Sequence, residues 1–135
     1  MTRTIRLATP DDIPTLVELL MLDAKARHAA DPILWKIADD APAQIAQALT
    51  FALTAEQQPF QQFWQVAEER ETVTGVIHSM LLPVPPIYAG PFGAPGLILP
   101  DSFVATDARA GTVEALLSAA EDALDEAGAR IKLAS

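Results

Sequence analysis

Residues 105–117, ATDARAGTVEALL, bring together an arginine, a glycine and the first turns of an apolar helix. A helix N-terminus presents unpaired backbone N–H groups and a partial positive charge, and glycine lets an anion approach the backbone closely. The guanidinium of Arg109 can add a charged hydrogen bond to a phosphate. The stretch therefore predicts one of two structures: a phosphate-binding loop, or a loop with a solvated arginine that leads into an ordinary core helix.

Two titratable side chains, Asp101 and His78, could take part in acid–base chemistry. Asp101 lies late in the apolar segment 96–106, where it could accept a proton from an attacking amine or simply pair with a donor beside a bulge. His78 lies in VIHSML, and a lone histidine among apolar neighbours is more often a hydrogen-bonded core residue than a catalytic group. Neither histidine of the chain belongs to a cluster with the spacing of metal ligands, so we expect no metal site.

Aromatic side chains supply the material for a substrate pocket. Tyr88 and Phe92 stand among the prolines and glycines of the segment 83–96, and we expect them to line a substrate pocket or a dimer surface. Other aromatic residues could shape an apolar acceptor pocket around this segment, although those within strands are more readily core residues. They are Trp35, Phe60, Phe63 and Trp64.

The elements that must position these residues follow from hydrophobic periodicity and capping signals. In the first part of the chain, the alternation in 4–8 predicts a strand. The sequence TPDD at 9–12 predicts the start of a helix that ends near His28, because it combines an N-cap threonine, a proline and two acidic residues. A second helix is expected to begin at Asp39 or Asp40.

The second part of the chain predicts a hairpin and a strand–helix–strand unit. The hairpin occupies 61–82, and in the apolar strand within 96–106 Pro100 predicts a bulge or an unpaired backbone position. Apolar positions in 111–127 predict a helix that Gly128 ends, before a last short strand. This order of elements predicts an α+β fold with a mixed sheet and helices packed on it.

The composition of the chain narrows the classes of function. Its 135 residues suit a single domain, 1–135, and a net charge of −9 argues against nucleic acid or an anionic membrane as a partner. The absence of cysteine excludes disulfides and, with the absence of a signal peptide, agrees with a cytoplasmic protein. Residues 72–100 carry no charged side chain, but six prolines and four glycines in this segment exclude a membrane-spanning helix.

The element order, together with TIRLATPDDIPTLVELL at 4–20 and LPDSFVATDARAGTVEALLSAAEDALDEAGARIKLAS at the end of the chain, resembles the GNAT superfamily of N-acetyltransferases. The resemblance implies a β-α-α-β-β-β-α-β fold with a mainly antiparallel, twisted sheet. It also implies acetyl-CoA as co-substrate and a small-molecule or peptide amine as acceptor. The cofactor-binding positions that it implies are Phe103, Val104, Ala105, Arg109, Ala110, Gly111 and Thr112, and the catalytic position is Asp101.

The phosphate loop departs from the pattern of that family, Arg/Gln-x-x-Gly-x-Gly/Ala. Counted from Arg109, the loop is one residue short, and Val113 takes the place of the last small residue. A β-branched side chain at this place would crowd a phosphate. The resemblance as a whole favours an N-acetyltransferase. The short loop and Val113 favour the alternative, a catalytically inactive GNAT-like module.

The end of the chain differs from the family as well. The family continues into another helix and two more strands, which often supply a tyrosine for the departing thiolate, whereas this chain stops at Ser135. We expect the last strand to leave an unpaired sheet edge, which favours a homodimer. The inactive alternative would act through this homodimerisation or through a partner protein.

Overall fold

The computed structural model describes residues 3–58, 60–82, 95–99, 102–105, 108–129 and 132–134, the last three by their backbone alone. In chain order the elements are β1 (Arg3–Leu7), the short 3-10 helix η1 (Pro10–Asp12), α1 (Ile13–Ala30), α2 (Ala41–Thr54), β2 (Gln62–Glu69), β3 (Thr72–Leu81), β4 (Gly96–Ile98), β5 (Phe103–Val104), α3 (Thr112–Glu126) and β6 (Lys132–Ala134). The predicted helices and strands are confirmed, with two short strands, β4 and β5, where one bulged strand was expected.

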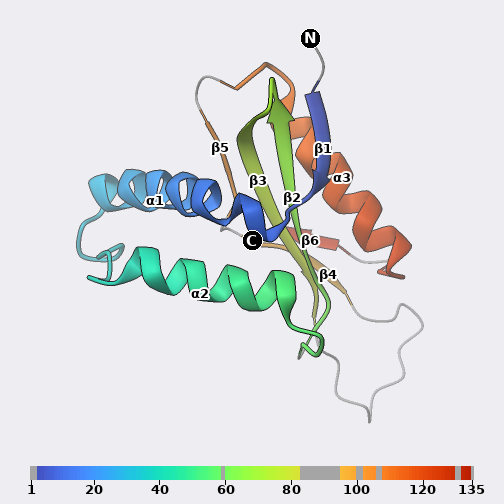
Figure 1. Ribbon diagram of the computed structural model, residues 1–135, viewed down its shortest axis with the longest axis horizontal. Helices are drawn as coiled ribbons and strands as arrows, with labels where there is room; N and C mark the ends of the chain where they lie inside the picture. The colour runs from blue at the N-terminus through green and yellow to red at the C-terminus, as the bar shows by residue number, and fades with distance from the viewer. Residues whose placement is uncertain are drawn as a thin grey trace.

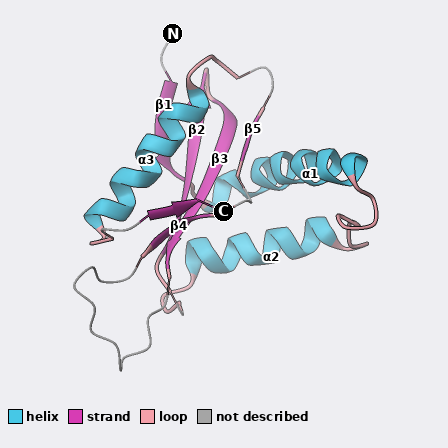
Figure 2. Ribbon diagram, turned by 180° about the vertical axis from the view of Figure 1, so that it is seen from behind, coloured by secondary structure: helices cyan, strands magenta, loops and turns pink. Residues whose placement is uncertain are grey.

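The strands form one mixed sheet in the order β1-β2-β3-β4-β6, and β5 also pairs with β3. All pairs are antiparallel except β4 and β6, which run parallel. The long hairpin of β2 and β3 forms the middle of the sheet (Figure 1). Helices α1 and α2 lie on one face of the sheet and α3 lies on the other, as the reverse view shows (Figure 2). The predicted mixed, mainly antiparallel sheet is confirmed.

Alternation along β2 and β3 gives the sheet an apolar side chain for each face. Val66 and Val76 belong to the core beneath α1 and α2, whereas their neighbours Ala67 and Ile77 pack against α3. The first core also contains Leu16, Leu19, Leu20, Leu49 and Trp64, and the second contains Leu116 and Ala120. The sheet therefore separates two apolar layers, which the period of two in the sequence requires.

Two glycines let α3 lie close to the sheet. A Cβ atom added to Gly75 on β3 would stand 2.9 Å from Leu116 Cδ1, and one added to Gly96 on β4 would stand 2.9 Å from Leu124 Cδ1. Real Cβ atoms do not approach a neighbour so closely. The small residues therefore set the distance between α3 and the strands beside which the candidate site lies.

A polar network holds the beginning of α1 to the sheet. The carboxylate of Asp12 accepts hydrogen bonds from the backbone N–H of Thr9 at 2.7 Å and from the guanidinium of Arg6 at 2.8 and 3.0 Å. Arg6 also pairs with Glu68 on β2 at 3.0 Å. The hydrogen bonds from Arg6 favour the charged carboxylate and lower the pKa of Asp12 below its usual value.

Acid is expected to weaken this network at Asp12. Because the folded protein lowers the pKa of Asp12, this carboxylate adds stability in full above about pH 5 and loses it as the pH falls through about 4 and below. Asp12→Asn should lower the free energy of unfolding at pH 7 by about 1–3 kcal/mol and flatten its dependence on pH between about 5 and 3. Urea unfolding of both proteins across this range measures the difference. An unchanged slope in Asp12→Asn would contradict the assignment.

Among the described residues we find neither a membrane-spanning helix nor a metal-binding cluster. None of the helices described combines the length and the apolar character that a membrane span needs. Within the same residues, no three His, Cys, Asp or Glu side chains lie together as a metal site would place them. The uncharged segment 72–100 contributes strands β3 and β4 instead of a long helix.

Candidate functional site

The candidate site begins where β4 and β5 are interrupted. Leu99 still donates its backbone N–H to the carbonyl of His78 on β3 at 2.8 Å. The Ser102 hydroxyl then accepts the backbone N–H of His78 at 3.1 Å and donates to the carbonyl of Leu99 at 2.9 Å. A side chain thus replaces the regular ladder after Leu99. Pro100 and Asp101 lie outside the described residues, so the bulge or unpaired backbone position expected at Pro100 stays a prediction.

An apolar hollow of about 470 Å³, which we call the β4–β5 hollow, lies between this break and α3. Its walls come from β3, β4, β5 and α3, and Arg27 of α1 reaches it as well. Its lining residues include Leu99 and Ser102 at the break, Phe103 and Val104 on β5, and Val113, Leu116 and Leu117 on α3. Two of the predicted cofactor-binding residues, Phe103 and Val104, therefore share a wall with the first turn of α3.

The loop before α3 ends at a glycine in a left-handed conformation. Gly111 is the N-cap residue with φ of +88°, and the helix begins at Thr112. The first N–H groups of a helix have no partner within the helix, and the N-cap residue Gly111 has no side chain that could cap those of α3. Val113, the second helical residue, is 49% exposed and lines the β4–β5 hollow. The positive end of α3 therefore lies beside the hollow.

Strands β1 and β2 supply partners for the polar groups of this loop. Glu69, the last residue of β2, accepts the backbone N–H of Arg109 at 3.2 and 3.3 Å, and its carboxylate lies 3.0 Å from the Thr112 hydroxyl. Arg3 on β1 donates to the carbonyl of Ala110 at 2.6 Å and to the Thr112 hydroxyl at 3.2 Å. We call these two side chains the Arg3–Glu69 pair, since their charged groups lie 3.6 Å apart.

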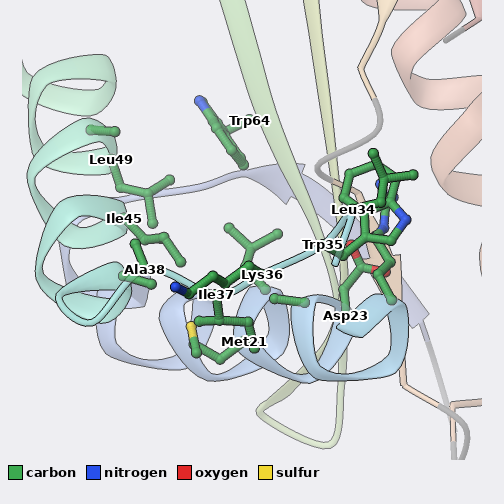
Figure 3. A pocket seen from close by; sticks show the side chains of 15 residues that line it. Met21, Asp23, Leu34, Trp35, Lys36, Ile37, Ala38, Ile45, Leu49 and Trp64 are labelled. Carbon is green, nitrogen blue, oxygen red and sulfur yellow. The ribbon is translucent and has the colours of Figure 1, made fainter. Parts of the chain in front are cut away.

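A second hollow, which we call the α1–α2 hollow, has a volume of about 400 Å³. It lies between α1, the connection at 34–38, α2 and the ring of Trp64 (Figure 3). Leu34, Ile37, Ile45 and Leu49 give it apolar walls. Arg27 lines both hollows, so this one side chain of α1 lies at the border of each.

Arg27 is held by two neighbours at the end of α1. Its guanidinium pairs with Asp23 at 3.2 Å and lies 5.1 Å from the centre of the Trp35 ring. The ion pair and the cation–π contact fix the side chain where the two hollows meet. Trp35 therefore lines an apolar hollow from the connection between α1 and α2. The expected acceptor pocket around the segment 83–96 falls largely outside the described residues and stays a prediction.

His78 is buried against an aromatic partner. Its ring stacks on Trp64 at 3.8 Å between ring centres, and both rings reach the Gln62 side-chain oxygen, at 2.8 Å from His78 Nε2 and 3.1 Å from Trp64 Nε1. Since the indole can only donate, the Gln62 oxygen acts as an acceptor, and the hydrogen bond assigns the Nε2 proton to His78. The prediction of a hydrogen-bonded core histidine is confirmed.

The structure places the remaining predicted residues in different surroundings. Ala105 packs against the core beneath α1 and donates its N–H to Thr74 at 2.8 Å, so it contributes to the sheet. Arg109 is exposed. Tyr88, Phe92 and Asp101 lie outside the described residues.

Sequence reasoning missed Arg3, Glu69 and Ser102. The partners of Arg3 and Glu69 are 107 and 40 residues away along the chain. No local pattern marks such contacts. Only Ser102 had a local signal in the sequence, because it lies two residues after Pro100, where an irregularity in the strand was expected.

The sequence matches no protein-family model and no curated protein sequence. Solved structures share the fold. A predicted acetyltransferase with acetyl-CoA from Clostridium acetobutylicum is 17% identical, with a TM-score of 0.72 over 99% of this chain and 80% of that one. A GCN5-related N-acetyltransferase from Ralstonia eutropha is 21% identical, with a TM-score of 0.69 over 99% of this chain and 83% of that one.

An aminoglycoside acetyltransferase from an uncultured soil sample, in complex with sisomicin, is 19% identical, with a TM-score of 0.65 over 98% of this chain and 76% of that one. At these identities the likeness establishes the fold. The chain therefore has the fold of the GNAT N-acetyltransferases, and the predicted fold class is confirmed.

Proposed function

We propose that the chain binds acetyl-CoA in the β4–β5 hollow and transfers the acetyl group to an amine. One observation carries the proposal: an interrupted strand and the N-terminus of α3 flank the same apolar hollow. A helix N-terminus suits phosphate oxygens, and an apolar channel suits the pantetheine arm. Acetyl-CoA accompanies one structure with the same fold, which supports this choice of ligand.

The proposed reaction is attack of a neutral amine on the thioester carbonyl. A C–N bond forms, the C–S bond breaks, and the thiol of CoA leaves. The apolar side chains of Phe103, Val104 and Leu116 would exclude water from the thioester and so limit its hydrolysis. Asp101, two residues after Leu99 in the sequence, is the candidate for the group that accepts the proton of the amine.

The α1–α2 hollow is the proposed acceptor site. Arg27 lines both this hollow and the β4–β5 hollow, so an amine bound here would approach the thioester from the side of α1. Its apolar walls and the rings of Trp35 and Trp64 favour an acceptor with an apolar body. Tyr88 and Phe92 are proposed to complete this pocket, or alternatively a dimer surface.

A second candidate function is a module without catalysis that acts through protein contacts in the cytoplasm. Two observations favour it: Val113 stands where the family has glycine or alanine, and Glu69 engages the loop donor at Arg109. Ile33 in the connection between α1 and α2 is 93% exposed, and such an apolar side chain can serve a contact surface. Homodimerisation along the edge of β6 remains part of this proposal.

An assay of thiol release from acetyl-CoA separates the two functions. The enzyme hypothesis predicts release that depends on an added amine, in a panel that runs from apolar monoamines to an aminoglycoside and a peptide N-terminus. Asp101→Asn should lower the rate at neutral pH by about 100-fold without loss of acetyl-CoA binding. Binding without release for every amine in the panel would favour the second function.

A further inference from the structure

We propose that the carboxylate of Glu69 is a built-in competitor for the phosphates of the acyl-CoA, which must displace it from the loop before α3. The inference rests on the proposed function, because it assumes that acyl-CoA phosphates reach this loop. It assigns Glu69 a regulatory contact: the side chain keeps the loop closed in the free protein and lowers the affinity for the cofactor. Nothing in the reaction itself requires this residue.

The backbone fixes Glu69 beside the loop. It pairs in register with Arg3 on β1 and with Thr72 on β3, at the end of the β2–β3 hairpin. The two turn residues that follow, Arg70 and Glu71, both adopt positive φ values, of 50° and 64°, so the chain reverses at once. The side chain of Glu69 is only 12% exposed. Its carboxylate is therefore held against the loop by the register of three strands.

The groups around this carboxylate are those that a phosphate would use. A backbone N–H from Arg109 and the guanidinium of Arg3 lie around the Glu69 oxygens as donors, at 3.2 to 3.6 Å. The Thr112 hydroxyl lies 3.0 Å from the same carboxylate and has a second acceptor in the Arg109 carbonyl at 2.6 Å. Carboxylate and phosphate oxygens accept hydrogen bonds from the same kinds of donor. Two anions cannot share these donors at hydrogen-bond distance without strong repulsion. Binding of a phosphate here and the closed contact of Glu69 therefore exclude each other.

Displacement of Glu69 would also change the environment of Arg3. In the closed state the charge of Arg3 is compensated by Glu69, which lies near its Nε. The Nη2 atom of Arg3 donates a hydrogen bond to the carbonyl of Ala110 at 2.6 Å. A phosphate in place of the carboxylate would take over the pairing with Arg3. The free-energy cost of displacing Glu69 thus lowers the affinity only for ligands that carry the phosphates. A ligand without phosphates binds without displacing Glu69.

Glu69→Gln tests the inference, because the amide keeps the shape and one acceptor oxygen but loses the charge. Calorimetry should show that this variant binds CoA about tenfold more tightly than the original protein. Pantetheine, which lacks the pyrophosphate, should bind both proteins equally. Glu71→Gln is the matched control, since it makes the same charge change at an exposed position of the same hairpin, and its affinity for CoA should change less than about twofold.

The other possible results overturn either the inference about Glu69 alone or the proposed function as well. Equal or weaker binding of CoA by Glu69→Gln overturns the inference while the proposed function stands. The same gain in Glu71→Gln, or a gain for pantetheine, assigns the effect to general charge or to altered packing and also overturns it. No CoA binding by any of the proteins overturns the proposed function together with the inference.

A second variant tests the inference even if Glu69→Gln does not fold. Glu69→Asp keeps the charge but withdraws the carboxylate by one methylene from the Arg109 N–H, so it should give a gain between those of the original protein and Glu69→Gln. Thermal unfolding shows whether each variant is folded at the temperature of the titration. If Glu69→Gln is unfolded, the absence of any gain in folded Glu69→Asp overturns the inference.

Discussion

Replacing Val113 with tryptophan is expected to abolish the binding of acetyl-CoA, with a loss of affinity of about 100-fold or more. Val113 lies in the first turn of α3, where its half-exposed side chain forms part of the wall of the β4–β5 hollow. An indole at this position would fill the hollow beside Leu117 and cover the N–H groups at the helix N-terminus. Because the side chain points to an open space, the fold should tolerate the substitution.

The matched control for this variant is Ser118→Trp. Ser118 is exposed on the same helix and does not line the hollow, so tryptophan there should leave the affinity for acetyl-CoA within about twofold of the original. Val113→Ala should act in the opposite direction and tighten binding about threefold to tenfold, since a smaller side chain clears the approach of a phosphate. Calorimetry measures all three variants. Unimpaired binding by Val113→Trp would place the ligand elsewhere on the molecule.

Replacing Leu16 with alanine is expected to lower the free energy of unfolding by about 3 kcal/mol. Leu16 on α1 is fully buried against Leu49, Trp64 and Val66, in the core that joins α1 and α2 to the sheet. Truncation removes its buried methyl groups and leaves a cavity that close-packed neighbours fill only in part. Urea unfolding at neutral pH measures the loss.

The same helix offers the control for this prediction. Leu22 is 51% exposed, so Leu22→Ala should change the free energy of unfolding by less than about 1 kcal/mol. Both substitutions remove the same atoms and create the same helix-favouring alanine. Equal losses at the two positions would mean that α1 does not pack on the sheet through the face that contains Leu16.

The elements of this fold were largely predictable because their signals are local. In the TPDD sequence, Pro10 begins η1 and Asp12 is the N-cap residue of α1, and Gly111 and Gly128 stand on either side of α3. Pro100 marked the interruption between β4 and β5, since proline cannot donate to a strand ladder. These features depend on neighbouring residues, so one sequence is enough to predict them.

The candidate site was predictable only in part, because its remaining contacts depend on the packing of distant elements. The start of α3 and the wall residues Phe103 and Val104 followed from the resemblance to the acetyltransferases. The contact of Glu69 with the Arg109 N–H depends on the register of β2 against β1 and β3, which no motif encodes. The α1–α2 hollow likewise depends on how the connection at 34–38 folds over Trp64.

Two features of the loop before α3 affect how tightly a phosphate can bind there. Gly111 occupies the helix N-cap, and counting from it places Val113 at the last small-residue position of the family pattern and Ala108 at its Arg/Gln position. Counted in this way the loop has all six positions of the pattern, so the missing residue expected from the count at Arg109 is not required. Glu69 already engages the loop. We therefore expect acyl-CoA binding that is weakened by Val113 and Glu69 but retained through the N-terminus of α3 and the apolar hollow.

Isothermal titration of the unmodified protein with acetyl-CoA measures whether the loop and the β4–β5 hollow bind an acyl-CoA. We expect saturable binding of one acetyl-CoA per chain with a micromolar dissociation constant, and its loss in Val113→Trp. The heat capacity change of binding should be negative, because the ligand buries the apolar walls of the β4–β5 hollow. The absence of binding at millimolar acetyl-CoA would mean that the loop and the hollow are not an acyl-CoA site.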